Sequence, residues 1–157
     1  MQVKDFMIRD VISVTEGTTI RELLEILVNH KIGGVPVISN ENKLVGMISD
    51  GDVIRYLKPN SRTVFDMFAI IMVNEQEKLT DKLGYSLEKN VSNLMKTRDI
   101  KTVKPESDLD IALAIFSKHH FKKIPVVDRE DKVVGVISRG DLLRHITMEI
   151  INKEKTS

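Results

Sequence analysis

A hydroxyl and a carboxylate stand three residues apart at two places in this sequence. They are Ser49 and Asp52 in the phrase GMISDGD, and Ser138 and Asp141 in the phrase GVISRGD. At the start of a helix such a pair can cap free backbone N–H groups, or both groups can face a small molecule. Because the same pair occurs twice and a Gly separates its members, the pattern favours a binding module over an enzyme.

The residue types of this chain give little indication of catalysis. The chain has no Cys, and its four His follow no metal-ligand spacing and lack clustered acids beside them. The two Ser-x-x-Asp pairs also have no His partner at a repeated position, so no nucleophile with its base can be assembled. We therefore predict no enzyme activity, no catalytic cofactor and no metal site.

The two phrases close two copies of one longer unit. Residues 10–56 align with residues 99–145 without a gap, and with a slip of one residue the match extends upstream to pair 3–7 with 91–95. A constant spacing of this kind is the signature of duplicated supersecondary units.

Each copy shows the same order of signals. A β-prone run (11–15, 100–104) precedes a helix whose apolar residues recur at helical spacing. A buried strand with Pro near its start (35–38, 124–127), a polar turn and a second strand (44–48, 133–137) follow as a hairpin. The phrases then open a second helix, over 52–57 and 141–151. The apolar helix positions are Ile20, Leu23, Leu24 and Leu27 in the first copy, and Leu109, Ala112, Leu113 and Phe116 in the second.

These signals predict an α+β fold made of two β-α-β-β-α repeats. One repeat alone has too little core to be stable, so we expect the two to pack sheet to sheet. The predicted organisation is repeat one over 1–58, a helical linker or insertion over 59–90, repeat two over 91–151 and a solvated tail over 152–157. The insertion carries a dense apolar stretch over 62–73, for which core burial and a dimer contact both stay open.

Composition narrows the class of protein. With 41% hydrophobic and 30% charged residues, the chain has the balance of a soluble globular protein. A formal net charge of +1 gives no electrostatic case for nucleic-acid binding. The apolar stretches are far shorter than the roughly 20 residues that span a membrane, and the N-terminus lacks a signal-peptide pattern. We therefore expect a cytoplasmic protein.

The order of elements, the buried Val-Pro-Val and Ile-Pro-Val strands and the doubled phrase resemble the cystathionine β-synthase (CBS) domain family. The chain is similar to a tandem CBS pair, or Bateman module, over nearly all of its length outside 59–90 and the tail. The resemblance implies a pseudo-twofold module. In such a module each ligand site takes its ribose-binding Ser and Asp from one repeat and its adenine slot from the other.

The resemblance assigns roles to particular residues. Ribose would be bound by Ser49 and Asp52 in one site and by Ser138 and Asp141 in the other. The adenine slots would be formed by Val14, Thr15, Thr19, Ile32, Gly34 and Val35 in repeat one, and by Val103, Lys104, Asp108, Phe121, Lys123 and Ile124 in repeat two. For Ile32, Val35, Phe121 and Ile124 the alternative is a plain core position.

Positive charges at the family's phosphate positions occur only in repeat two. They are Lys122, Lys123 and Arg139, and repeat one has Gly33, Gly34 and Asp50 at the matching places. We therefore expect the Asp141 site to hold an adenine nucleotide through its phosphates. The Asp52 site would be empty, weaker or suited to an adenosine compound without phosphate. The alternative is that the three positive residues are solvated surface charges.

Together these patterns predict a non-catalytic regulatory module that binds AMP, ADP or ATP as a regulatory ligand and senses energy or metabolite state. The alternative is a dimerisation or interaction scaffold with vestigial nucleotide sites. The resemblance also implies a homodimer through the CBS modules, to which residues 62–73 could add, and an effector protein that the sequence does not identify. We expect neither nucleic acid nor membrane as a partner.

Overall fold

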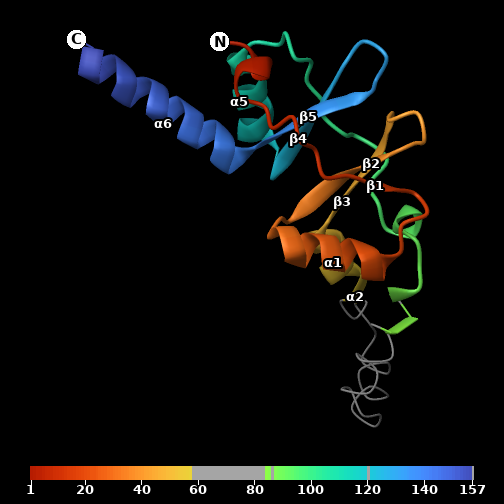
Figure 1. The fold of residues 1–157 in the computed structure, drawn as a ribbon. Helices are drawn as coiled ribbons and strands as arrows, with labels where there is room; N and C mark the ends of the chain where they lie inside the picture. Colours follow the sequence, from red (N-terminus) through yellow and green to blue (C-terminus); the bar gives the residue numbers. More distant parts are fainter. Residues whose placement is uncertain (58–83, 86, 120, 157) are drawn as a thin grey trace.

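The computed structural model describes residues 1–57, 84–85, 87–119 and 121–156, and has the predicted α+β architecture of two similar repeats (Figure 1). The apolar stretch over 62–73 lies outside these residues. The elements of the first repeat are β1 (Val14–Thr15), α1 (Ile20–His30), β2 (Gly34–Ile38), β3 (Leu44–Ser49) and α2 (Asp50–Leu57). Those of the second are α5 (Leu109–Lys118), β4 (Lys123–Val127), β5 (Val133–Ser138) and α6 (Arg139–Thr156). A short 3-10 helix lies at the start of each repeat, η1 (Val3–Asp5) and η2 (Val91–Asn93).

The strand register places the phrases beside the start of each buried strand. In the first repeat β1 runs parallel to β2, and β2 pairs antiparallel with β3 so that Gly34 lies opposite Ser49. In the second repeat β4 and β5 pair in the same way, with Lys123 opposite Ser138. The first β-prone run is shorter than predicted in both copies, and in the second only Val103 pairs, through a parallel bridge to Val126.

The two hairpins contact each other through reciprocal hydrogen bonds. The Leu44 amide donates to the Asp131 carbonyl (3.1 Å), and the Val133 amide donates to the Asn42 carbonyl (3.0 Å). These two bonds connect positions that the repeat alignment treats as equivalent. The module is therefore pseudo-twofold, as the resemblance implied.

Each repeat completes its core with the first residues of the other repeat. Val91 is fully buried among the apolar residues of repeat one, and its amide donates to the Thr18 carbonyl (2.8 Å). Val3 is fully buried in the core of repeat two, and its amide donates to the Ser107 carbonyl (2.8 Å). The N-terminal segment thus packs on repeat two, although it precedes repeat one along the chain.

The first glycine of each phrase leaves room for these exchanged segments. A Cβ at Gly135 would lie 2.7 Å from the Met7 sulfur, and a Cβ at Gly46 would lie 2.8 Å from the Met95 sulfur. Both distances are shorter than carbon–sulfur contacts allow. The opening glycine of the doubled phrase therefore serves packing between the repeats.

The helix ends of the first repeat agree with the sequence prediction better than those of the second, because α2 ends at Leu57 as predicted whereas α6 extends past residue 151. The Thr19 hydroxyl caps α1 by accepting a hydrogen bond from the Glu22 amide (3.1 Å). Both second helices begin earlier than predicted, at Asp50 and at Arg139. Helix α6 continues to Thr156, so the residues expected as a tail extend this helix, with exposed side chains, away from the rest of the module (Figure 1).

Candidate ligand-binding cavity

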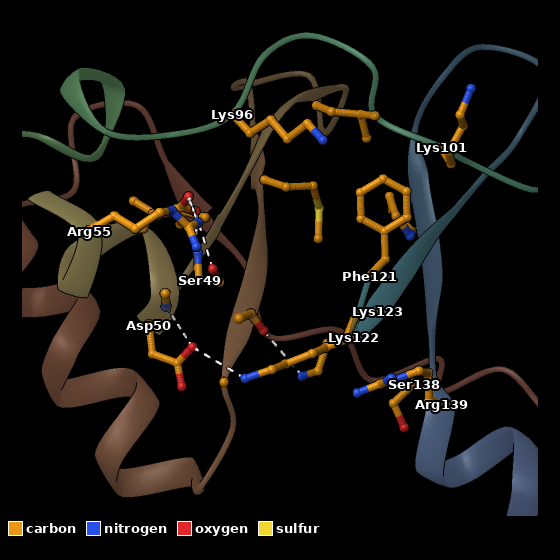
Figure 2. A pocket seen from close by; sticks show the side chains of 18 of the residues that line it. Ser49, Asp50, Arg55, Lys96, Lys101, Phe121, Lys122, Lys123, Ser138 and Arg139 are labelled. Carbon is orange, nitrogen blue, oxygen red and sulfur yellow. Dashed lines mark hydrogen bonds and ion pairs between the residues drawn. The ribbon is translucent and has the colours of Figure 1, made fainter. Parts of the chain in front are cut away.

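A cavity of about 570 Å³ lies between the two repeats (Figure 2), and we call it the inter-repeat cavity. Both phrases, the start of β4 and the segment that follows η2 contribute to its wall. Its volume is in the range of sites that hold a small organic ligand. The lining residues on which the argument below depends are Gly34, Ser49, Asp50, Asp52, Arg55, Lys96, Lys101, Phe121, Lys122, Lys123, Ser138 and Arg139.

The Asp52 carboxylate is held within its own turn. One of its oxygens, Oδ2, accepts hydrogen bonds from the Ser49 amide (2.9 Å) and the Ser49 hydroxyl (3.2 Å). The other, Oδ1, accepts from Arg55 Nη2 at 2.7 Å. A carboxylate has about four acceptor positions, so these bonds orient the group and leave acceptor capacity toward the cavity. Capping of the turn and a ligand-binding role are therefore compatible here.

The Asp141 carboxylate repeats this arrangement in the second copy. The Asp141 Oδ2 accepts a hydrogen bond from the Ser138 hydroxyl (2.6 Å), and the backbone amide of Asp141 donates to that same hydroxyl (3.1 Å). Arg144 forms an ion pair with the Asp141 Oδ1. The Ser138 hydrogen bond, with smaller contributions from Arg144 and the Lys123 charge, holds the pKa of Asp141 below its ordinary value against the opposing effect of burial. Ser138 lines the inter-repeat cavity, whereas Asp141 is not among its lining residues.

Two arginines bind the aspartates of the doubled phrase, and the sequence analysis assigned neither of them a role. Arg55 and Arg144 each stand three residues after the Asp they bind, and the repeat alignment pairs them with each other. The guanidinium of Arg55 also occupies the space beside Gly51, because a Cβ there would lie 3.1 Å from its Nη1. The repeated Arg was the available signal, and it was visible in the same alignment as the Ser and Asp.

The lysines at the start of β4 reach across to repeat one. Lys122 Nζ lies 3.6 Å from Asp50 Oδ1, and Lys123 Nζ donates to the Gly34 carbonyl at 3.1 Å (Figure 2). Burial lowers the pKa of Lys123, and the Asp141 charge opposes this shift. The sequence analysis expects these bases at the Asp141 site. The structure places both lysines in one cavity with Ser49 and Asp52, because the start of β4 faces repeat one, and Ser138 and Arg139 line the same cavity.

An aromatic surface adjoins the lysines. Lys96 Nζ lies 4.7 Å from the centre of the Phe121 ring, and the His119 ring stacks on the same residue with centroids 5.2 Å apart. Lys96 and Lys101 come from the segment that follows η2, and the sequence analysis assigned them no role. Their place in the wall follows from the exchange of segments between repeats, which no local pattern reveals.

The predicted adenine-slot residues divide into two groups. Gly34, Phe121 and Lys123 line the inter-repeat cavity, and the other nine are not among its lining residues. Of these nine, Val14, Val35, Val103 and Ile124 are buried in the two cores, and Ile32 packs against the core of repeat one. Thr19 and Asp108 occupy the N-cap positions of α1 and α5, the Thr15 amide donates to the Thr18 hydroxyl, and the Lys104 ammonium donates to the Asp128 carbonyl.

Two other kinds of site are not seen in the described part of the chain. Among these residues no group of His, Asp and Glu is arranged to hold a metal ion. No described helix combines the length and the apolar character needed to cross a membrane.

Comparison with known families identifies the fold unit. A family model for the CBS domain matches residues 3–59 and, a second time, residues 91–147. The chain belongs to the CBS domain family. The two matched ranges contain the two phrases and all the strands described above, so the CBS pair accounts for both walls of the inter-repeat cavity.

Relatives and solved structures agree with this assignment. The chain is 34% identical to the chloroplastic CBS domain-containing protein CBSX1 of Arabidopsis thaliana, over 90% of this chain and 62% of that protein. The crystal structure of CBSX2 in complex with AMP superposes with a TM-score of 0.71 at 26% identity, covering 94% of this chain and 96% of the other. The CBS domain pair of protein MJ0100, in complex with 5′-methylthioadenosine and S-adenosyl-L-methionine, superposes with a TM-score of 0.70 at 25% identity, covering 95% and 98%.

Proposed function

We propose that this CBS pair is a regulatory, non-catalytic module that binds an adenosine-containing ligand in the inter-repeat cavity. One observation carries the proposal: the cavity joins the Ser49–Asp52 turn of one repeat to Phe121 and Lys123 of the other. This is the pairing across repeats that the sequence resemblance predicts for a ribose-binding carboxylate and an adenine slot.

The chemistry of the wall suits the parts of such a ligand. The Asp52 carboxylate, held by Ser49 and Arg55, keeps one acceptor position for a hydrogen bond from a ribose hydroxyl group. The Phe121 ring lines the cavity, and a flat base would pack against it in place of the Lys96 ammonium that lies over it. The AMP complex of CBSX2 and the 5′-methylthioadenosine and S-adenosyl-L-methionine complex of MJ0100 support the class, because all three ligands contain adenosine.

A ligand in this position would touch both repeats at once. It would regulate by favouring one relative arrangement of the repeats, provided that it binds that arrangement more tightly than the other. We propose that an effector protein recognises this arrangement.

Isothermal titration calorimetry with AMP and ATP tests the proposal directly. We expect Asp52→Asn to weaken binding on the order of tenfold, because a hydrogen bond to a charged group contributes about 1.5–3 kcal/mol. Glu41→Gln is the matched control, since this exposed carboxylate lies in the turn at the far end of the β2–β3 hairpin. In a thermal-shift assay, ligand at 100 times its Kd should add about 2.7 kcal/mol of stability. No stabilisation by any adenosine compound would refute the proposal.

A second candidate function is an interaction or dimerisation scaffold with vestigial nucleotide sites. It is favoured by the apolar side chains that α6 exposes, Leu143 (63%), Met148 (55%) and Ile150 (53%). Leu143 and Ile150 are seven residues apart and lie on one face of α6, and a contiguous exposed apolar surface is typical of sites that bind another protein. Sedimentation velocity distinguishes the candidates: a scaffold would show a stable dimer, broken by Ile150→Asp, without any response to adenosine compounds.

A further inference from the structure

We propose that an effector protein docks on the outer face of α5 through an amphipathic segment that carries apolar and acidic side chains, and that this docking is coupled to the inter-repeat cavity. The inference rests on the proposed function, because it names the surface at which the state of that cavity is recognised. Its basis is a groove beside α5, the difference between this groove and the matching face of α1, and the residues that the groove shares with the cavity.

An open groove of about 400 Å³ runs along α5, and we call it the α5 groove. Its lining includes Lys101, Ile111, Ala114, Ile115, Lys118 and His119. The four of these that belong to α5 recur at positions i, i+3, i+4 and i+7, so they form one face of the helix. The Ile111 side chain is 48% exposed and Ala114 is exposed as well, so the middle of this face is apolar and open to a partner.

The matching face of α1 shows that the fold does not require an apolar surface here. The repeat alignment pairs Ile111 with Glu22, and it pairs Ala114 with Glu25. Both glutamates are exposed on α1, so the same helix of the same supersecondary unit carries charged groups in repeat one. Exposed apolar side chains add little to the stability of the chain that carries them, and together they are typical of a surface that another protein covers.

The charge of the α5 groove indicates the chemistry of that protein. Lys101 and Lys118 form no ion pair within the described part of the chain, and their matching residues in repeat one, Ile12 and Asn29, are uncharged. The acidic lining residue, Asp110, lies in the first turn of α5, where a carboxylate stabilises the helix dipole. The groove therefore complements a segment whose acidic groups stand beside its apolar side chains.

The α5 groove is connected to the wall of the inter-repeat cavity. Lys101 lines both, and Figure 2 shows its ammonium pointing away from Asp50 and Lys122. His119 lines the groove and stacks on Phe121, which lines the cavity, with ring centroids 5.2 Å apart. A base packed on Phe121 would order this stack, so a segment that contacts His119 would meet it already ordered. We therefore expect each of the two to strengthen the binding of the other.

Peptide selection on the full chain tests the inference. The probe is a displayed library of random peptides, selected on the wild type and counter-selected on the double variant Ile111→Glu/Ala114→Glu. This variant carries the residues of repeat one at exposed helix positions, so it should fold. We expect the enriched peptides to combine apolar with acidic residues, and a labelled enriched peptide to bind the double variant at least about tenfold more weakly than the wild type. Val28→Glu is the matched control, because it adds the same charge at a 72% exposed position on α1 and should change nothing.

Fluorescence anisotropy with the same labelled peptide tests the charge and the coupling. Lys118→Met should weaken its binding about threefold, as expected for an exposed charge pair, and Lys118→Arg should retain most of the affinity. Lys153→Met, in the exposed last turn of α6, removes the same charge away from the groove and should have no effect. Saturating AMP should tighten peptide binding about fivefold, which is at the lower end of usual couplings between two sites.

The outcomes separate this inference from the proposed function. If the enriched peptides lack acidic residues, or bind the double variant as tightly as the wild type, the inference is refuted and the proposed ligand binding stands. If AMP binds in calorimetry but leaves peptide binding unchanged, the inference is refuted in the same way. A wild-type dimer in sedimentation velocity that the double variant dissociates would assign the groove to a second copy and refute the inference as well. If neither AMP nor ATP binds, the proposed function fails and the inference fails with it.

Discussion

The Lys122 ammonium lies 3.6 Å from the Asp50 carboxylate, and this ion pair joins the two repeats across the inter-repeat cavity. Both side chains are well exposed, at 65% and 45%, so the pair adds little to the stability of the fold. Its consequence is electrostatic. Asp50 neutralises a lysine that would otherwise be available to an anionic ligand.

Removing the Asp50 charge should therefore strengthen the binding of a phosphate-bearing ligand. We expect Asp50→Asn to raise the affinity for ATP about two- to fivefold, the range of an exposed charge pair, without changing the affinity for adenosine. The Asn oxygen can still accept the hydrogen bond that Asp50 receives from the Gly51 amide, so the turn is preserved. The measurement is titration calorimetry beside Glu41→Gln, and a loss of ATP affinity would contradict this view of the pair.

Phe121 should contribute to binding in a way that does not depend on charge. We expect Phe121→Leu to weaken ATP and adenosine equally, by about fivefold, because an aromatic ring on a flat base adds about 1 kcal/mol beyond buried area. Tyr85→Leu is the control, since this tyrosine is 75% exposed and does not line the cavity. If Phe121→Leu affected ATP alone, the ring would be acting through Lys96, which lies over it.

The elements of this fold follow from local patterns, whereas the wall of the cavity does not. The spacing of Ile20, Leu23 and Leu27 predicts α1, because helical periodicity depends on near neighbours in the chain. The doubled Ser and Asp likewise identify both turns. The partners of those turns come from elsewhere in the chain, so no sequence window contains them.

The position of Lys122 illustrates this limit. The lysine count predicted two unequal sites and assigned the bases to the Asp141 site, and the inequality stays a prediction. The start of β4 faces repeat one, and Lys122 pairs with Asp50 there. Lys96 enters the wall only because η2 and the residues after it pack on repeat one. Both facts concern packing between repeats, which the residue pattern within one repeat does not determine.

The exchange of segments gives a prediction on stability. Gly135→Ala places a Cβ 2.7 Å from the Met7 sulfur and 3.1 Å from the Ile8 carbonyl oxygen. Because Met7 is packed in the core of repeat two, we expect this substitution to lower the free energy of unfolding by about 1–3 kcal/mol. Equilibrium unfolding in urea measures the change.

Two further variants make this prediction specific. Gly17→Ala is the control, because a Cβ at Gly17 meets nothing within 4 Å and its stability should be unchanged. Adding Met7→Ala to Gly135→Ala relieves the contact with sulfur, so the double variant should lose less stability than the sum of the single losses. Additive losses would mean that the Met7 side chain does not clash with the Cβ introduced at position 135.

The Asp141 carboxylate predicts a dependence of stability on pH. Its pKa is lowered in the folded protein, chiefly by the Ser138 hydrogen bond. A lowered pKa means that the ionised form stabilises the fold. This contribution is complete above the ordinary Asp pKa of about 3.9 and disappears as the pH falls through the lowered folded value. Asp141→Asn should therefore be about 1 kcal/mol less stable than the wild type at pH 7, and nearly equal to it at the acidic limit.

Urea unfolding of both proteins between pH 7 and pH 2.5 measures this difference. Glu25→Gln, an exposed carboxylate on α1, is the control for general effects of charge on acid stability. Ser138→Ala should reproduce part of the loss at pH 7, because it removes the hydrogen bond that chiefly lowers the pKa of the carboxylate. If the Asp141→Asn difference stayed constant down to the lowest pH, the loss would come from side-chain packing, and the ionised carboxylate would not be what stabilises this turn.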